Sequence, residues 1–74
     1  MAGVKTDKYT TINLDNIVSI QIFTLSGKRN IVFADVKGGY YSSQHMSEEE
    51  CRKVYDLVIS KLFTNELIDI NKLI

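Results

Sequence analysis

The chain has 74 residues, enough for one small domain with a modest core. Nine basic and nine acidic side chains give a formal net charge of zero, so the composition offers no strong electrostatic signal for nucleic-acid binding. A hydrophobic content of 45% without proline argues against long disordered stretches and indicates a folded globular protein.

The number of cysteines and the hydropathy of the sequence indicate the cellular compartment. Cys51 is the only cysteine, and a lone free thiol is typical of a reducing compartment. The N-terminal residues contain no apolar run of the kind found in a secretory signal. No stretch approaches the roughly 18 apolar residues that span a bilayer. We therefore expect a cytoplasmic protein with no membrane partner.

The N-terminal segment is expected to be loose and to lead into a sheet. Residues 1–7 are polar and are predicted to be flexible. Residues 9–14 (YTTINL) alternate between two faces, which indicates a first strand. Asp15 and Asn16 then favour a short turn, because their side chains bond local backbone groups.

Three further strands are predicted to follow. In the stretch IVSIQIFTL, alternation places Val18, Ile20 and Ile22 on one face. The next strand is apolar on both faces, and the last is short. The predicted strands cover residues 17–25, 30–36 and 40–43, with glycine-containing turns at 26–29 and 37–39. Together with the first strand, they predict an antiparallel β-meander of about four strands over residues 9–43.

A helix is predicted over residues 47–63. Ser47 and Glu50 form the pattern S-x-x-E, in which the serine hydroxyl and the glutamate carboxylate each accept from the other residue's amide. Glutamates in the first turn also suit the positive end of the helix dipole. The residues that follow place Cys51 and several larger apolar side chains on one broad stripe.

The C-terminal segment, residues 64–74, fits two structures. Leu67, Ile70 and Leu73 are spaced as on a helix, whereas Ile68 and Ile70 alternate as on a strand. A disordered tail rarely carries so many aliphatic side chains. We expect an extension that docks on the domain or on a partner.

The predicted fold class is α+β: a small antiparallel meander, one amphipathic helix and an apolar C-terminal extension within a single domain of residues 1–74. Four strands followed by one helix, over roughly residues 9–63, resembles the topology of PUR-type single-strand nucleic-acid-binding domains, which dimerise. The resemblance concerns topology alone and assigns no residue a role.

His45 and Cys51 are the candidates for catalysis or metal binding. A metal site needs about four ligands at suitable spacing, and a thiol nucleophile needs a base and an orienting group. Cys51 instead falls on the apolar stripe of the helix, and His45 precedes the helix cap. We expect no enzyme, and no catalytic, cofactor-binding or metal-ligating residue.

Asp35 interrupts an apolar strand, on the same side as Ile31 and Phe33. An inward-pointing charge is one way to protect a sheet edge from unwanted pairing. Alternatively, Asp35 pairs with Lys37, with Arg29 or with a group on a second chain. The sequence leaves these alternatives open.

The apolar surface exceeds what one small domain covers, because the second and third strands carry apolar side chains on the face away from the helix. Large exposed apolar patches mark partner surfaces. We therefore expect a small non-catalytic protein-interaction module, a regulator, inhibitor or assembly subunit, that forms a homo-oligomer or binds another protein. The predicted interface comprises Phe23, Leu25, Val32, Val36, Leu67, Ile70, Leu73 and Ile74.

A single-stranded nucleic-acid-binding domain is the alternative. Aromatic side chains on a sheet can stack bases, and nearby cations can hold phosphates. The residues that would carry this function are Lys28, Arg29, Lys37, Tyr40 and Tyr41.

Overall fold

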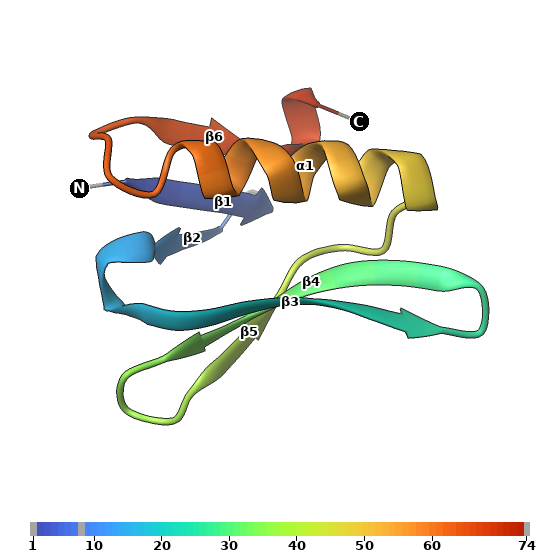
Figure 1. Cartoon of the computed structure of the whole chain (residues 1–74), viewed down its shortest axis with the longest axis horizontal. Helices are drawn as coiled ribbons and strands as arrows, with labels where there is room; N and C mark the ends of the chain where they lie inside the picture. Colours follow the sequence, from blue (N-terminus) through green and yellow to red (C-terminus); the bar gives the residue numbers. More distant parts are fainter. Residues whose placement is uncertain (1, 8, 74) are drawn as a thin grey trace.

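The structure is a computed structural model that describes residues 2–7 and 9–73. These described residues form six strands in two three-stranded sheets and one α-helix, which confirms the α+β class (Figure 1). The strands are β1 (Gly3–Asp7), β2 (Thr10–Asn13), β3 (Ile17–Leu25), β4 (Lys28–Asp35), β5 (Tyr40–Ser42) and β6 (Leu67–Asp69). The helix is α1 (Glu48–Ser60), and short 3-10 helices span Leu14–Asn16 and Ile70–Lys72.

The larger sheet is a meander in the order β3-β4-β5, with both pairs antiparallel. Ser26 and Gly27 connect β3 to β4 with positive φ angles of 52° and 77°. Two successive positive φ angles match the right-handed twist of a tight hairpin, and glycine adopts them without steric cost. Gly38, at φ 87°, lies in the turn between β4 and β5.

The smaller sheet corrects two of the sequence predictions. β1 pairs antiparallel with β2 and parallel with β6, so residues 3–7 of the segment predicted to be flexible form the central strand of a sheet. Val4 and Thr6 of β1 are buried, as is Ala2 just before it, and Met1 lies outside the described residues. The strand predicted at residues 9–14 corresponds to β2, which pairs with β1 and not with the meander. The four-strand arrangement that resembled PUR-type domains is therefore absent from the described residues.

The helix begins as predicted. The Ser47 hydroxyl accepts a 3.2 Å hydrogen bond from the Glu50 amide, and Oε1 of Glu50 accepts a 3.0 Å bond from the Ser47 amide. These bonds form the capping box and satisfy two amides that have no partner within the helix. The helix ends at Ser60, one turn before the predicted end at Phe63.

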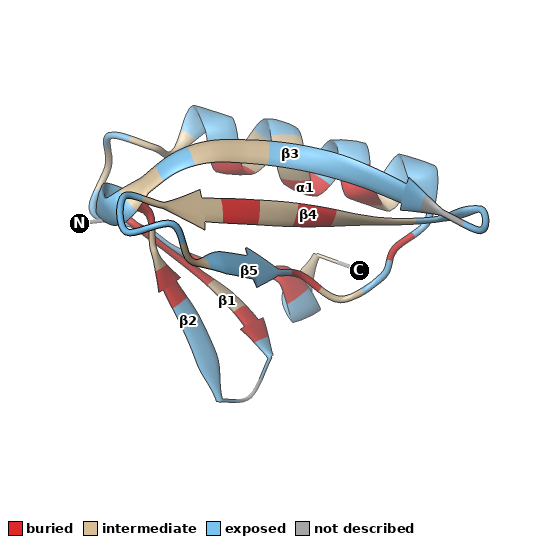
Figure 2. Cartoon of the chain, turned by 90° about the horizontal axis from the view of Figure 1, so that it is seen from below, coloured by how far each residue is buried: buried red, intermediate tan, exposed pale blue. Residues whose placement is uncertain are grey.

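The core lies between the meander and a second layer made of α1 and the smaller sheet (Figure 1). Buried positions line the inward sides of the helix and of β4, while much of β3 and β5 is exposed (Figure 2). The C-terminal segment completes this core, because it forms β6 and then a 3-10 helix. The largest fully buried side chains are Phe33, Ile31, Ile70, Val4, Val54, Val58 and Cys51.

A β-bulge changes the predicted face of Val18. Ile17 pairs with Asp35 and Ser19 pairs with Ala34, so Val18 is an extra residue with no opposite partner. Ile17 and Ile20 both pack on the core, whereas Val18 is 65% exposed. The prediction that Val18 shares the inner face with Ile20 is therefore wrong, and the inserted residue is the reason.

Candidate interaction surfaces

The side of the meander away from α1 carries one charged side chain among its described strand positions, Lys28 at the hairpin end of β4. The register places Ser19, Ala34 and Tyr40 in one cross-strand row, and Gln21, Val32 and Ser42 in the next. Because side chains alternate, these rows face away from buried Ile31 and Phe33. We call this surface the outer face; it comprises Ser19, Gln21, Phe23, Lys28, Asn30, Val32, Ala34, Tyr40 and Ser42.

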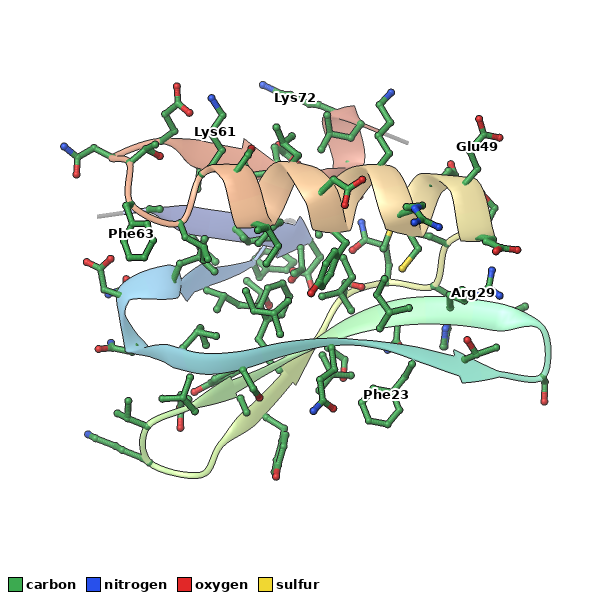
Figure 3. The ribbon with its side chains drawn as sticks, viewed as in Figure 1. Phe23, Arg29, Glu49, Lys61, Phe63 and Lys72 are labelled. Carbon is green, nitrogen blue, oxygen red and sulfur yellow. The ribbon has the colours of Figure 1, made fainter. Side chains whose placement is uncertain are left out.

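The outer face is open to solvent and partly apolar. Figure 2 looks directly at it, and no described helix or strand lies in front of it. Phe23 is 50% exposed and points away from α1, while Tyr40 is 75% exposed (Figure 3). Val32 and Ala34 lie half-buried between them. The surface therefore presents two aromatic side chains around an aliphatic centre.

The second open feature is the free edge of β3. Within the described residues, β3 pairs with β4 on one side and with no strand on the other. This strand is nine residues long and contains neither a charged residue nor proline. Charges and proline are the usual protections of an exposed strand edge. Here only the bulge at Val18 interrupts the edge, near its start.

A cleft of about 340 Å³ lies between this edge and the flank of α1, and we call it the edge cleft. Ile22 of β3 is 41% exposed beside it. Arg29 and Glu48 form an ion pair of 2.8 Å between Nη1 and Oε2, and this contact lowers the pKa of the Glu48 carboxyl. The cleft is lined by Ile22, Arg29, Glu48, Cys51, Arg52, Tyr55 and Asp56.

The residues of the predicted partner interface do not form one surface. Phe23 and Val32 lie on the outer face, and Val36 is exposed at the turn after β4. Leu67 is 62% exposed on the smaller sheet. Ile70 is fully buried and Leu73 packs against the core, so both contribute to the domain's own interior. The Leu25 side chain and Ile74 lie outside the described part of the structure.

The residues of the alternative nucleic-acid surface are also separated. Lys28 begins β4, a strand of eight residues that spans roughly 25 Å, and Lys37 lies in the turn beyond its other end. Arg29 is engaged by Glu48 and by a 3.1 Å hydrogen bond to the Thr24 hydroxyl. Tyr40 is on the outer face, whereas Tyr41 lies on the other face, opposite Phe33.

Asp35 has a structural role in the turn between β4 and β5. Its Oδ1 accepts hydrogen bonds of 2.9 Å and 2.8 Å from the Lys37 and Gly39 amides. Its Oδ2 accepts a 2.9 Å bond from the Tyr41 hydroxyl. The hydrogen bond from the Gly39 amide has the largest effect in lowering the pKa of the Asp35 carboxyl, and the bond from the Tyr41 hydroxyl has the next largest. The hydrogen bond to Asp35 also raises the pKa of Tyr41. The open question about its partner is thereby answered: Asp35 holds the turn together.

Cys51 and His45 occupy different environments. Cys51 is fully buried, and burial raises the pKa of its thiol, which opposes formation of a reactive thiolate. His45 is exposed in the loop before α1. Among the residues that the structure describes, no group of three or more His, Cys, Asp or Glu side chains is arranged to hold a metal ion.

Sequence reasoning missed the edge cleft, because its walls come from β3, β4 and α1, which meet only in the fold. One signal was available: the stretch IVSIQIFTL lacks the charges that protect an edge strand.

Comparisons of the chain with protein-family models, curated proteins and solved structures give no match. None of the described helices is long and apolar enough to cross a membrane.

Proposed function

We propose that the chain is a small non-catalytic protein-interaction module that self-associates through the outer face. The observation that carries the proposal is a partly apolar sheet face, charged only at Lys28 on its rim, that no described element covers. Two sheets pack face to face about 10 Å apart when their facing side chains are apolar. The meander is covered on its inner side only, and in the proposed dimer the meander of a second copy covers its outer face.

The absence of charge from the centre of the outer face favours a second copy as the occupant. In a two-fold dimer the same surface of both copies meets at the interface, so a charged residue near the axis would lie opposite the same charged residue of the second copy. The centre of the outer face has no such charge, because Lys28 lies at the hairpin end of the face, and the whole chain has a formal net charge of zero. Burying about 400 Å² of apolar surface contributes on the order of 10 kcal/mol, of which association recovers only a part.

Sedimentation of matched variants tests the proposal. We expect the natural chain to form a dimer at about 100 micromolar, and Phe23→Lys to shift it to monomer, because two cations would be desolvated in the interface. Tyr9→Lys is the control, because Tyr9 is an exposed aromatic residue beside β2 and outside the outer face. A natural chain that sediments as a monomer of 8.4 kDa under these conditions refutes self-association.

A further inference from the structure

We propose that the free edge of β3 and the edge cleft bind an extended, uncharged segment of another protein, which adds as a strand to the meander. This site lies on a different surface from the outer face and goes beyond self-association. Its occupant is defined by main-chain chemistry. An unpaired edge presents alternating N–H and C=O groups, and these are complementary to another extended polypeptide.

The length and composition of β3 suit this role. The bulge distorts only the start of the strand, so Ser19 to Leu25 remain regularly paired with β4 on the other side. These seven residues exceed the five or six of an average strand, so a bound segment of ordinary length would be hydrogen-bonded throughout. Because β3 carries no charge, pairing desolvates no ionised group on the strand itself.

The edge cleft supplies contacts for the inward side chains of the added strand. They would lie beside Ile22, which is exposed at the rim, and face half-buried Tyr55 on the flank of α1. The charges around the cleft balance: Arg29 is paired with Glu48, and Arg52 lies one helical turn from Asp56. A cleft without net charge favours an uncharged, apolar segment over an acidic or basic one.

The position of α1 argues against a second copy at this edge. In both views the helix runs alongside β3 on the inner side of the sheet (Figures 1 and 2). Two β3 strands paired edge to edge would lie about 4.8 Å apart, whereas packed helices need axes about 8–10 Å apart. A two-fold pair of β3 strands would therefore bring the two helices into collision. A single extended segment carries no helix and avoids it.

A synthetic peptide provides the probe. An eight-residue peptide of alternating threonine and valine, with blocked ends, is titrated into the Phe23→Lys variant, and amide hydrogen exchange of each residue is measured. Phe23→Lys removes the proposed self-association and leaves the inner side of the edge intact. We expect at least about tenfold slower exchange at alternate amides of β3, because alternate N–H groups of an edge strand point outward.

Two controls separate strand addition from general apolar adhesion. The same peptide N-methylated at alternate amides cannot pair, so it is expected to give no protection. Ile22→Lys places a charge on the inward side of the edge and is expected to weaken binding at least about tenfold. Equal binding of the N-methylated peptide, protection at β2, β5 or β6 instead of β3, or no protection at about 1 mM peptide would overturn the proposal. Sedimentation of the natural chain reports on self-association independently.

Discussion

The Tyr41 hydroxyl and the Asp35 carboxylate are joined by a 2.9 Å hydrogen bond between the last residue of β4 and the middle of β5. The same carboxylate accepts from two amides of the intervening turn. The bond therefore links a strand pair to the turn that connects it, and the ionised form of Asp35 is the form that all three donors favour.

The first prediction concerns pH and Asp35. Because folding lowers the pKa of this carboxyl, its stabilising effect is present above the unfolded pKa of about 3.9 and is lost as the pH falls through the folded value. We expect Asp35→Asn to lower the thermal midpoint at neutral pH, and the difference from the natural chain to shrink between about pH 5 and about pH 2. Thermal melts monitored by circular dichroism measure this difference.

Asp56→Asn serves as the control for Asp35→Asn, because Asp56 lies on the exposed flank of α1. Glu48 and Glu50 also have lowered pKa values, and both residues are present in the natural chain and in both variants. Their contribution to the loss of stability at low pH is therefore common to all three proteins. A midpoint difference for Asp35→Asn that stays constant with pH would contradict a role for the ionised carboxylate.

The second prediction concerns the helix cap. Ser47→Ala removes the acceptor of the Glu50 amide and should cost about 0.5–2 kcal/mol of the free energy of unfolding. Because the two residues bond reciprocally, Ser47→Ala and Glu50→Ala should be less than additive when combined, as measured by urea unfolding. Strictly additive losses would mean that the two bonds act independently.

The third prediction separates core from surface in the C-terminal segment. Ile70→Ala removes a fully buried side chain and should cost about 2–5 kcal/mol. Leu67→Ala, three residues earlier at an exposed position, should change stability by only about 0.5 kcal/mol. Urea unfolding of both variants checks the prediction, and equal losses would show that Ile70 is not in the core.

The fourth prediction concerns the hairpin between β3 and β4. Ser26 has a positive φ of 52°, which asparagine tolerates better than serine, and Asn-Gly is the favoured pair in such turns. We expect Ser26→Asn to raise the free energy of unfolding by about 0.5–1 kcal/mol. Gly27→Ala should act in the opposite direction by about 1 kcal/mol, through backbone strain alone, because an added Cβ would meet no other atom within 4 Å. A loss of stability in Ser26→Asn would contradict this account.

The sequence predicts the features that depend on neighbouring residues. The capping box was recognised because Ser47 and Glu50 act on each other's amides within one helical turn. Burial of Cys51 followed from the helical stripe for a similar reason. The broad α+β class needed only a change of hydrophobic period along the chain.

The features that the sequence did not reveal depend on distant pairing. Ala2, Val4 and Thr6 alternate as in a strand, but this pattern is too short and weak to predict one. The strand is defined by its pairing with β2 and β6, which come from distant parts of the chain. The inserted Val18 reverses the face of neighbouring residues, and no local signal locates such an insertion. The edge cleft was missed for the same reason, since α1 and β3 meet only in the folded chain.

The parallel pairing of β1 with β6 also sets the timing of folding during synthesis. Gly3 donates a 3.1 Å hydrogen bond to the Glu66 carbonyl. The pairing of β1 with β6 therefore cannot form until residues more than sixty positions further along the chain have been synthesised. At about 5–20 residues per second, a ribosome takes several seconds to cover that distance. Until then β1 and β2 form only a two-stranded ribbon, which is marginally stable alone. The nascent chain therefore exposes a sheet edge during elongation that the finished domain has closed.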